Sequence, residues 1–404
     1  MASAPIEQSP SPELEPTPPE VKRYQRQKLT AQLGSLGLNL SLLVIMAVWG
    51  GPKLDQLLRP FLGENRWLRL IALAFVYAAS MELLTLPLDF WSGFVLEHRY
   101  QLSNQTFFRW VWRQIKGYLI GGPIGLMLLL GFYSLFWYAG PWWWLWAAAG
   151  WLAVTLILGQ ILPVVILPLF YKVTALGDSA LMERLQRVAN GTGLNIQGVY
   201  RLHLSAETRK ANAALAGLGH TRRVLLGDTL LDQFTPDEIE VVFAHEVGHH
   251  VHRHLLKMVV WGVLTAGASF WLADRVLRAA APALGYAPTE LLPAYQDPSA
   301  LPLLLVVLSL FGLVLAPLQN AVSRFFERQC DRYALERTGL AQAYRSAFTK
   351  LARINKSDPD PHPIVVWLFE DHPPIRRRMA MADVVIPHQS EAVAESGPTA
   401  SLGH

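Results

Sequence analysis

The longest uncharged stretch of the chain constrains its fold most. From Gly117 to Tyr171 there is no Asp, Glu, Lys or Arg, and the dipeptide Gly140-Pro141 divides the run in two. A helix needs about 20 apolar residues to cross a bilayer, and a Gly-Pro pair favours a turn. The sequence therefore predicts a hairpin of two membrane-spanning helices.

Four other apolar segments approach the same length. The six predicted spans lie near 31–50, 67–90, 117–139, 143–170, 256–277 and 301–319. Composition agrees with a membrane protein, because 52% of the residues are hydrophobic and only 16% are charged, whereas soluble domains carry roughly 25% charged residues. The predicted fold class is mainly α, a polytopic membrane helix bundle of six to seven spans.

Three carboxylates interrupt the predicted spans. We expect Asp89 and Asp274 at span ends, whereas Glu82 lies deeper. An ionised group at membrane depth is costly and should face the interior of the bundle or a wet cavity. Two alternatives stay open for Glu82: it lines such a cavity, or it makes a hydrogen bond from one helix to another.

The positions of Lys and Arg predict the orientation of the chain. The loop 281–300 contains neither residue, so it belongs outside the cytoplasm. Threading back from this loop places residues 172–255, and the chain after about 320, on the cytoplasmic side. The basic N-terminal segment and the basic loop 99–116 fall on the same side. A short basic loop between the first two spans then falls outside the cytoplasm, contrary to the excess of Lys and Arg expected in cytoplasmic loops.

The predicted domain boundaries follow from this pattern. They are a disordered tail over 1–28, spans one to four over 29–171, a first catalytic segment over 172–255, spans five and six over 256–319, a second catalytic segment over 320–387 and a disordered tail over 388–404. The two tails are rich in polar residues and proline, and such segments cannot bury enough apolar surface to become ordered.

The first catalytic segment reads as a small α+β domain. A helix is expected over 181–194, strands over 199–205 and 222–231, and a Gly-rich loop over 212–219 between the strands. The single cysteine, Cys330, excludes an internal disulfide framework. No basic stretch is interleaved with aromatic residues, so nucleic acid is not an expected partner.

A histidine cluster follows a clear helix start. Thr235, Pro236 and Glu238 provide an N-cap, a first-turn proline and a capping box. On the helix that follows, His245 and His249 are four residues apart and therefore share one face. Two imidazoles at this spacing can bind one zinc ion.

Glu246 lies next to this pair, where it can accept a proton from a water whose pKa is lowered by zinc. This arrangement predicts hydrolysis. The remaining histidines of the cluster, His250, His252 and His254, are expected to face solvent or lipid headgroups.

A catalytic zinc ion takes three protein ligands and a water. By spacing alone, the third ligand is one of Glu327, Asp331, Glu336, Glu370 and His372. Glu327 is favoured because it is the first carboxylate after the sixth span. Asp331 follows four residues later on the same predicted helix, where it could orient a liganding histidine.

The spans, the H-E-x-x-H pattern and 320-NAVSRFFERQCD-331 together resemble the integral-membrane zinc metallopeptidases typified by the type I CAAX prenyl protease. Other segments that resemble this family are 95–117, 168–176, 222–231 and 371–379. The resemblance covers roughly residues 97–379. It implies a bundle of spans that encloses a large chamber and carries a small α+β zinc-metallopeptidase domain.

The resemblance also implies roles for individual residues. One Zn²⁺ per chain is held by His245, His249 and Glu327, and Glu246 is the general base. His372 hydrogen-bonds the scissile carbonyl or the oxyanion.

Further roles are implied around this centre. Asn212 holds the substrate backbone along an edge strand, and Arg378 ties the His372 loop to the core. Arg324 is expected to be structural. Cys330 stands where the family usually has a small residue, and no metal role is expected for it.

The predicted function is that of a membrane-integral zinc endopeptidase, similar to the CAAX prenyl proteases, that cuts peptide bonds near the cytoplasmic membrane face. Its partners would be the bilayer and a peptide or protein substrate, prenylated or membrane-embedded. The membrane would be the cell membrane in a bacterium and the endoplasmic reticulum in a eukaryote. An alternative is a quality-control protease for damaged or stalled membrane proteins. A non-catalytic membrane scaffold is a third hypothesis, against which the intact zinc pattern argues.

Overall fold

The computed structural model describes residues 17–194, 198–217 and 223–395. The chain forms two compact units. The helical unit comprises Arg26–Phe170 and Leu255–Leu318, and the sheet unit comprises the chain up to Gln25, Tyr171–His254 and the chain from Gln319 onward. Residues 1–16 and 396–404, which the sequence predicts to be disordered, lie outside the described residues.

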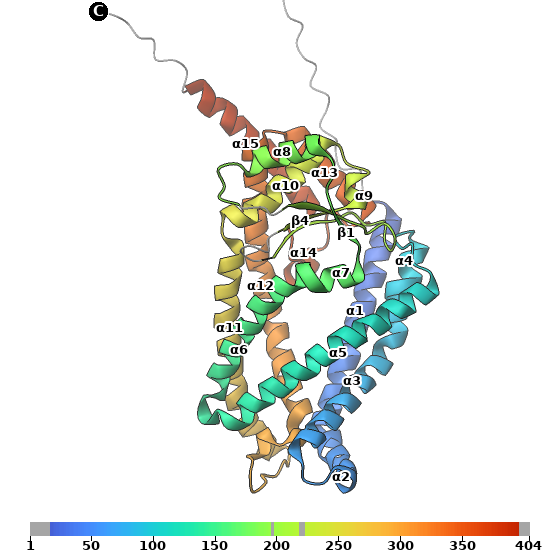
Figure 1. The fold of residues 1–404 in the computed structure, drawn as a ribbon, viewed down its shortest axis with the longest axis vertical. Helices are drawn as coiled ribbons and strands as arrows, with labels where there is room; N and C mark the ends of the chain where they lie inside the picture. The colour runs from blue at the N-terminus through green and yellow to red at the C-terminus, as the bar shows by residue number, and fades with distance from the viewer. Residues whose placement is uncertain (1–16, 195–197, 218–222, 396–404) are drawn as a thin grey trace, which may run out of the picture. The chain divides into compact units, whose positions relative to one another are not determined.

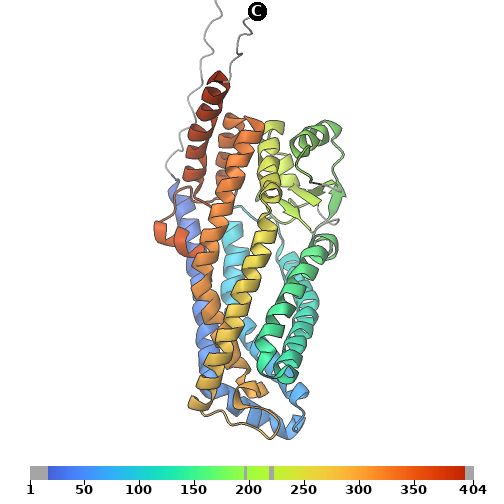
Figure 2. The ribbon, with the colours of Figure 1, turned by 90° about the vertical axis from the view of Figure 1, so that its left-hand side faces the viewer.

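Six helical segments of the described residues are long and apolar enough to cross a membrane (Figures 1 and 2). They are Pro19–Leu62, Arg66–Arg99, Phe107–Tyr138, Gly140–Phe170, His254–Ala283 and Pro298–Thr338. Each predicted span lies within one of them, except that the third was predicted to end one residue later, at 139. The predicted mainly helical membrane bundle is therefore confirmed, with six candidate spans in the described residues.

Several of these segments join more than one helix. The first contains α1 (Pro19–Ile45), the π-helix η1 (Met46–Gly50) and α2 (Gly51–Leu62); the second contains α3 (Arg66–Phe90), the π-helix η2 (Trp91–Val95) and α4 (Leu96–Arg99). The third is α5 (Phe107–Tyr138), and the fourth contains η3 (Gly140–Trp142), α6 (Trp143–Ile161), η4 (Leu162–Ile166) and α7 (Leu167–Phe170). The last two are α11 (His254–Ala283), and η7 (Pro298–Ala300) with α12 (Leu301–Thr338), preceded by the short η6 (Ala294–Gln296).

The N-terminal helix begins earlier than the sequence predicts. Residues 19–28 belong to α1 and not to a disordered tail, so the predicted boundary at residue 28 is wrong. A proline in the first turn followed by Lys, Arg and Gln is compatible with a helix start. Tyr24 is fully buried, and its hydroxyl accepts a hydrogen bond from Lys210 Nζ at 3.1 Å. Burial of Tyr24 within the sheet unit therefore orders this part of α1, and composition alone could not predict it.

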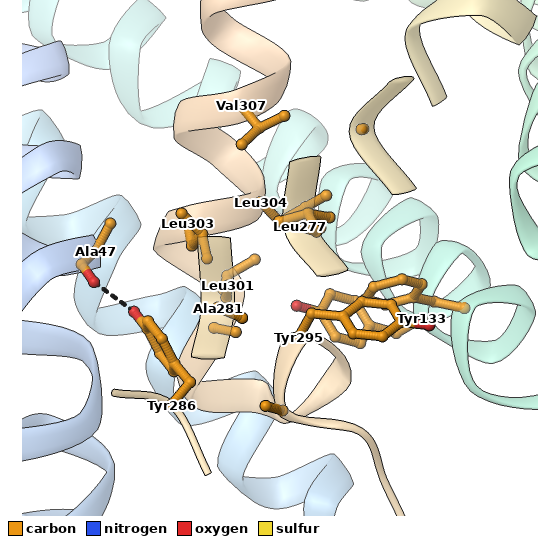
Figure 3. Packing of buried hydrophobic residues seen from close by; sticks show 14 of the residues in the cluster. Ala47, Tyr133, Leu277, Ala281, Tyr286, Tyr295, Leu301, Leu303, Leu304 and Val307 are labelled. Carbon is orange, nitrogen blue, oxygen red and sulfur yellow. Dashed lines mark hydrogen bonds between the residues drawn. The ribbon is translucent and has the colours of Figure 1, made fainter. Parts of the chain in front are cut away.

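Aromatic and aliphatic side chains form the core of the helical unit (Figure 3). Tyr133, labelled in Figure 3, is almost completely buried. Phe136 and Trp143 are fully buried, and their rings meet at an interplanar angle of 67°. Tyr286, beyond the end of α11, donates a hydrogen bond to the carbonyl oxygen of Ala47 at 2.7 Å.

Several buried polar groups of the helical unit are paired. Arg69 of α3 donates to both carboxylate oxygens of Asp55 of α2, at 2.7 and 2.6 Å, and to Asp297 at 2.8 Å. Asp274 accepts from Trp143 Nε1 at 2.7 Å, so it is buried within α11 and not at the end of the helix. Tyr118 of α5 donates to Glu82 of α3, which corresponds to the helix-to-helix alternative for Glu82.

The sheet unit contains a four-stranded sheet with the order β1-β2-β4-β3. The strands are β1 (Val173–Ala175), β2 (Val199–Leu202), β3 (Ala213–Ala216) and β4 (Arg223–Gly227). β2 and β4 are parallel, whereas β1 pairs with β2, and β3 with β4, in antiparallel fashion. β3 is thus an edge strand of this sheet, with Ala213 opposite Leu226.

Two predictions for this region are wrong in detail. Part of the segment predicted as a Gly-rich loop, 212–219, is the edge strand β3. The strand predicted over 222–231 ends at Gly227, and α9 (Asp228–Leu231) follows it. The Asp228 carboxylate accepts hydrogen bonds from the backbone of Leu204 and Ser205, both at 2.9 Å, which fixes the chain at this turn.

In the sheet unit, helices pack against the sheet and against one another. They are α8 (Ser179–Ala189), α9, α10 (Pro236–Val251), the end of α12, α13 (Ala341–Ile354), α14 (Pro363–Phe369) and α15 (Ile375–Glu395). α10 is buried among α8, β3 and α13. Residues 388–395 extend α15, so the tail predicted from residue 388 begins too early. α15 is held by Met379, Ala382 and Val385, which are buried.

Candidate metal centre

The predicted capping box forms at the start of α10. The Thr235 hydroxyl accepts from the Glu238 amide at 3.3 Å, and the Glu238 carboxylate accepts from the Thr235 amide at 2.8 Å. Lys350 of α13 also donates to Glu238, at 2.7 Å. The first turn of the helix is therefore fixed to its neighbour.

His245 and His249 project from consecutive turns of α10, with ring centroids 5.3 Å apart. Glu327 of α12 lies against both, because its two carboxylate oxygens are 3.2 Å from His245 Nε2 and 3.3 Å from His249 Nε2. One donor atom from each of the three residues lies within 4.8 Å of the others. The structure thus brings together the three residues that the family resemblance implies as ligands.

Asp331 and Arg378 support this group from behind. Asp331 Oδ1 is 3.0 Å from His245 Nδ1, and Arg378 donates to both carboxylate oxygens of Asp331, at 2.6 and 2.9 Å. The guanidinium also lies 3.9 Å from the ring centroid of Phe348. Asp331 can therefore orient His245, as the helical spacing suggested.

The donors fit a zinc ion. If the Nδ1–H of His245 donates to Asp331, its Nε2 carries a lone pair that points at Glu327 Oε2. That oxygen is buried and has no hydrogen-bond partner. A cation between the two atoms would satisfy both, and two imidazole nitrogens with one carboxylate form a ligand set typical of catalytic zinc.

The metal-free group holds a proton strongly. Burial lowers the pKa of His245, but the neighbouring carboxylates of Asp331 and Glu327 outweigh it and raise the pKa from 6.5 to about 9. Burial likewise opposes the charge of Arg378, yet the Asp331 carboxylate raises its pKa above the ordinary value. The site is thus built to hold positive charge.

Glu246 connects α10 to the edge of the sheet. Its Oε2 accepts a hydrogen bond from the backbone amide of Leu215 in β3 at 3.1 Å. A cleft of about 330 Å³, near the lower end of the usual size of ligand pockets, is lined by His245, Glu246, Asn212 and His372 among others. The predicted general base, the implied substrate residue and one zinc ligand thus share a cleft.

His372 lies on the segment between α14 and α15. Its Nδ1 is 2.7 Å from the carboxylate of Asp371, and its Nε2 is 3.5 Å from Glu327 Oε2. The hydrogen bond to Asp371 raises the pKa of His372, against the effect of burial. The imidazole is half-exposed, so it can meet a ligand in the cleft.

The His372 segment is held mainly by α12. Arg324 donates to the carbonyl oxygens of Val366, at 2.8 Å, and of Glu370, and Asn320 donates to Leu368 at 2.8 Å. Arg324 is structural, as expected, and it anchors this segment more directly than Arg378, whose side chain contacts Asp331.

Sequence reasoning missed two features of the site. Asn355 makes a two-point contact with the backbone of Ala211, at 2.9 and 3.1 Å, which holds the chain just before Asn212. His254 is 2% exposed, contrary to the prediction that it faces solvent or lipid headgroups. Its burial partners lie on α12, and no local pattern around residue 254 could indicate them.

Comparisons with known proteins agree over most of the chain. A family model described as "CAAX prenyl protease N-terminal, five membrane helices" matches residues 19–172, where the structure has four candidate spans, and a second, "Peptidase family M48", matches residues 175–385.

Individual proteins are also similar. The chain is 32% identical to "Uncharacterized metalloprotease YhfN" of Bacillus subtilis, over 79% of this chain and 74% of that protein. It is 31% identical to "CAAX prenyl protease 1" of Saccharomyces cerevisiae, over 75% of this chain and 69% of that protein. The crystal structure of S. mikatae Ste24p superposes with a TM-score of 0.79 at 25% identity, covering 93% and 92% of the two chains.

Proposed function

Since this chain belongs to peptidase family M48, as a multi-pass membrane endopeptidase of the CAAX prenyl protease type, we propose that its reaction depends on one zinc ion bound by His245, His249 and Glu327. The observation that carries the proposal is the convergence of these three side chains. Glu327 Oε1 faces His249, and Glu327 Oε2, which has no hydrogen-bond partner, faces His245. When bound there, zinc would polarise the scissile carbonyl and lower the pKa of a water toward neutrality.

Glu246 acts as general base. Its carboxylate accepts a proton from the attacking water and passes it to the amine of the departing peptide. The hydrogen bond from the Leu215 amide supports this role, because it fixes one carboxylate oxygen at the sheet edge and leaves the other available.

His372 stabilises charge on the reacting carbonyl oxygen by donating a hydrogen bond from Nε2. Asp371 holds the opposite nitrogen and favours the protonated ring. Preorganised donors of this kind act on charge that develops in the transition state.

The substrate extends along the free edge of β3. Because the Gly227 amide donates to the Asn212 carbonyl at 2.9 Å, residues 212 and 227 form a hydrogen-bonded pair. In antiparallel pairing the alternate residues then turn their amides and carbonyls away from β4. Ala213 would therefore present its amide and carbonyl to an added peptide strand. Leu215 would present its carbonyl, because its amide donates to Glu246. The Asn212 side chain would lie beside this strand.

A prenylated peptide is the substrate class we favour, because relatives with high coverage carry the name CAAX prenyl protease. We place the active site on the cytoplasmic side from the distribution of Lys and Arg. A quality-control protease is the competing outcome.

The test is cleavage of one CAAX peptide, with and without its prenyl group, by detergent-purified protein, with mass spectrometry to locate the cut. Glu246→Gln serves as the blank. Cleavage beside the cysteine only in the lipidated peptide is expected. Equal cleavage of both peptides, or cuts at scattered positions, would contradict prenyl specificity and favour quality control.

A further inference from the structure

We infer that His254 is a positioning residue that fixes the tautomer and orientation of His249; this inference rests on the proposed zinc site. His254 is the first residue of α11 and is 2% exposed. Arg253, with φ of 55°, makes the turn between α10 and α11.

A chain of three side chains sets the proton positions. His254 Nε2 is 2.9 Å from Gln329 Oε1, and His254 Nδ1 is 3.3 Å from His249 Nδ1. An amide oxygen accepts only, so His254 Nε2 carries the hydrogen. In a neutral ring Nδ1 is then an acceptor, and His249 Nδ1 must donate to it.

The consequence falls on the metal side of His249. With its hydrogen on Nδ1, the ring has its lone pair on Nε2, which is 3.3 Å from Glu327 Oε1. That is the protonation pattern a zinc ligand needs. Liganding histidines almost always donate their second nitrogen to a partner that fixes tautomer and ring orientation.

The His254 ring is itself held in place by α12. It stacks on Phe326 with centroids 4.2 Å apart and an interplanar angle of 13°, and its Nδ1 is 3.5 Å from Cys330 Sγ. These neighbours flank Glu327 in sequence. The helix that supplies the third ligand thus also holds the support of the second ligand.

The two zinc ligands of α10 therefore have different supports. His245 is backed by the Asp331 carboxylate, whereas His249 is backed by the imidazole of His254. A second metal ion on His249, His254 and Cys330 is the competing explanation, since their donor atoms also lie within 4.8 Å of one another. It would require His249 Nδ1 to bind metal in place of donating a hydrogen bond.

The experiment is a zinc competition titration against a chelator on purified full-length protein. His254→Phe keeps an aromatic ring against Phe326 but removes the acceptor, and it should weaken zinc binding about 10- to 100-fold. His254→Asn, which can again present an oxygen to His249, should recover part of the loss. His252→Phe is the control: it keeps an aromatic ring stacked on His254, at a centroid distance of 5.4 Å in the unmodified chain, and should leave the affinity unchanged.

Cobalt substitution provides a second readout. The visible absorption of the Co²⁺ protein should change in His254→Phe and return toward the wild-type spectrum in His254→Asn. If His254→Phe does not fold, Gln329→Leu tests the same chain, because it removes the acceptor that fixes His254; weakened zinc binding is again expected.

Several outcomes would overturn the inference. Wild-type zinc affinity and an unchanged cobalt spectrum in both His254→Phe and Gln329→Leu would remove the positioning role. Two zinc ions per chain, reduced to one by Cys330→Ser, would favour the second metal site. Zinc retention by Glu327→Ala would instead contradict the proposed function itself, so the two failures are distinguishable.

Discussion

Replacing Glu246 with glutamine removes a proton acceptor while nearly preserving the shape of the side chain. We expect Glu246→Gln to retain one zinc ion per chain and to lose turnover by roughly 10²- to 10⁴-fold or more, the scale of general-base catalysis. Zinc content by elemental analysis and peptide hydrolysis by mass spectrometry measure the two quantities. Turnover close to that of the wild type would assign the base to another residue.

Zinc binding should release a proton from His245. The pKa of this imidazole is raised from 6.5 to about 9, because the neighbouring carboxylates of Asp331 and Glu327 outweigh burial. Zinc binds only the neutral ring, so its apparent affinity should rise with pH up to about 9 and then level off. Without metal, the same protonation stabilises the fold, fully below pH 6.5, and this stability is lost as the pH rises through about 9.

Calorimetry in buffers of different ionisation enthalpy measures that proton. Asp331→Asn is the matched variant, because it removes the largest hydrogen-bonding contribution and should lower the number of protons released near pH 8. Zinc binding without proton release at this pH in the unmodified chain would mean that His245 is already neutral there.

At the residue scale, sequence reasoning reached the groups that share a short pattern. The spacing on one helix predicts His245, Glu246 and His249. The structure places the two histidines beside Glu327, and Glu246 lines the cleft together with His245. Spacing could not rank Glu327 decisively against other carboxylates, since its position depends on how α12 packs on α10. His254 was misplaced for the same reason: Phe326, Gln329 and Cys330, which contact its ring, are distant in sequence.

The contact between α10 and α12 depends on a glycine. A Cβ at Gly248 would lie 3.0 Å from Cys330 Cα and 3.2 Å from Cys330 Cβ. A backbone atom cannot rotate away, so Gly248→Ala should push the helices apart. His249, which follows Gly248, and Glu327, which lies one turn before Cys330, would then move apart. Overpacking of this kind lowers the free energy of unfolding by about 1–3 kcal/mol.

We therefore expect Gly248→Ala to lower both thermal stability and zinc affinity, measured by thermal unfolding and chelator competition. Gly262→Ala in α11 is the control, because a Cβ there has nothing within 4 Å. The double variant Gly248→Ala with Cys330→Gly should recover part of the loss. Unchanged zinc affinity in Gly248→Ala would show that the helices tolerate the methyl group.

At the element scale, the sequence predicts elements well where local signals agree. The start of α10 follows from its capping box, and the spans follow from apolar length. β3 was missed because small residues and glycine resemble a loop, whereas its pairing with β4 is a tertiary property. The first turns of α1 were missed because their order depends on the burial of Tyr24.

At the scale of the whole molecule, the sheet unit is assembled from separated parts of the chain. Residues 171–254 supply both histidine ligands, and the chain from residue 319 supplies Glu327, Asp331 and Arg378. The helices between them belong to the helical unit. The predicted family membership is confirmed by two family models, one over residues 19–172 and one over residues 175–385. How the two segments of the sheet unit meet could not be predicted from composition, because it depends on tertiary packing.

The single buried cysteine makes the orientation of the whole chain testable. Cys330 is 0% exposed, so the unmodified protein should react little with a membrane-impermeant maleimide. Glu290→Cys places an exposed thiol in the loop without Lys or Arg, and Gln186→Cys places one on the surface of α8. If the charge distribution sets the orientation, the first variant is labelled in sealed right-side-out vesicles and the second only in inside-out vesicles.

The basic loop between the first two spans is the weak point of the predicted orientation. It lies on the side opposite to the other basic segments, so its position must be measured. Lys53 is the position to compare: Lys53→Cys should label together with Glu290→Cys. Detergent should expose all three thiols equally, which controls for reactivity. Labelling of Gln186→Cys in right-side-out vesicles would invert the orientation and move the zinc site away from the cytoplasm, and a prenylated cytoplasmic substrate would then no longer reach it.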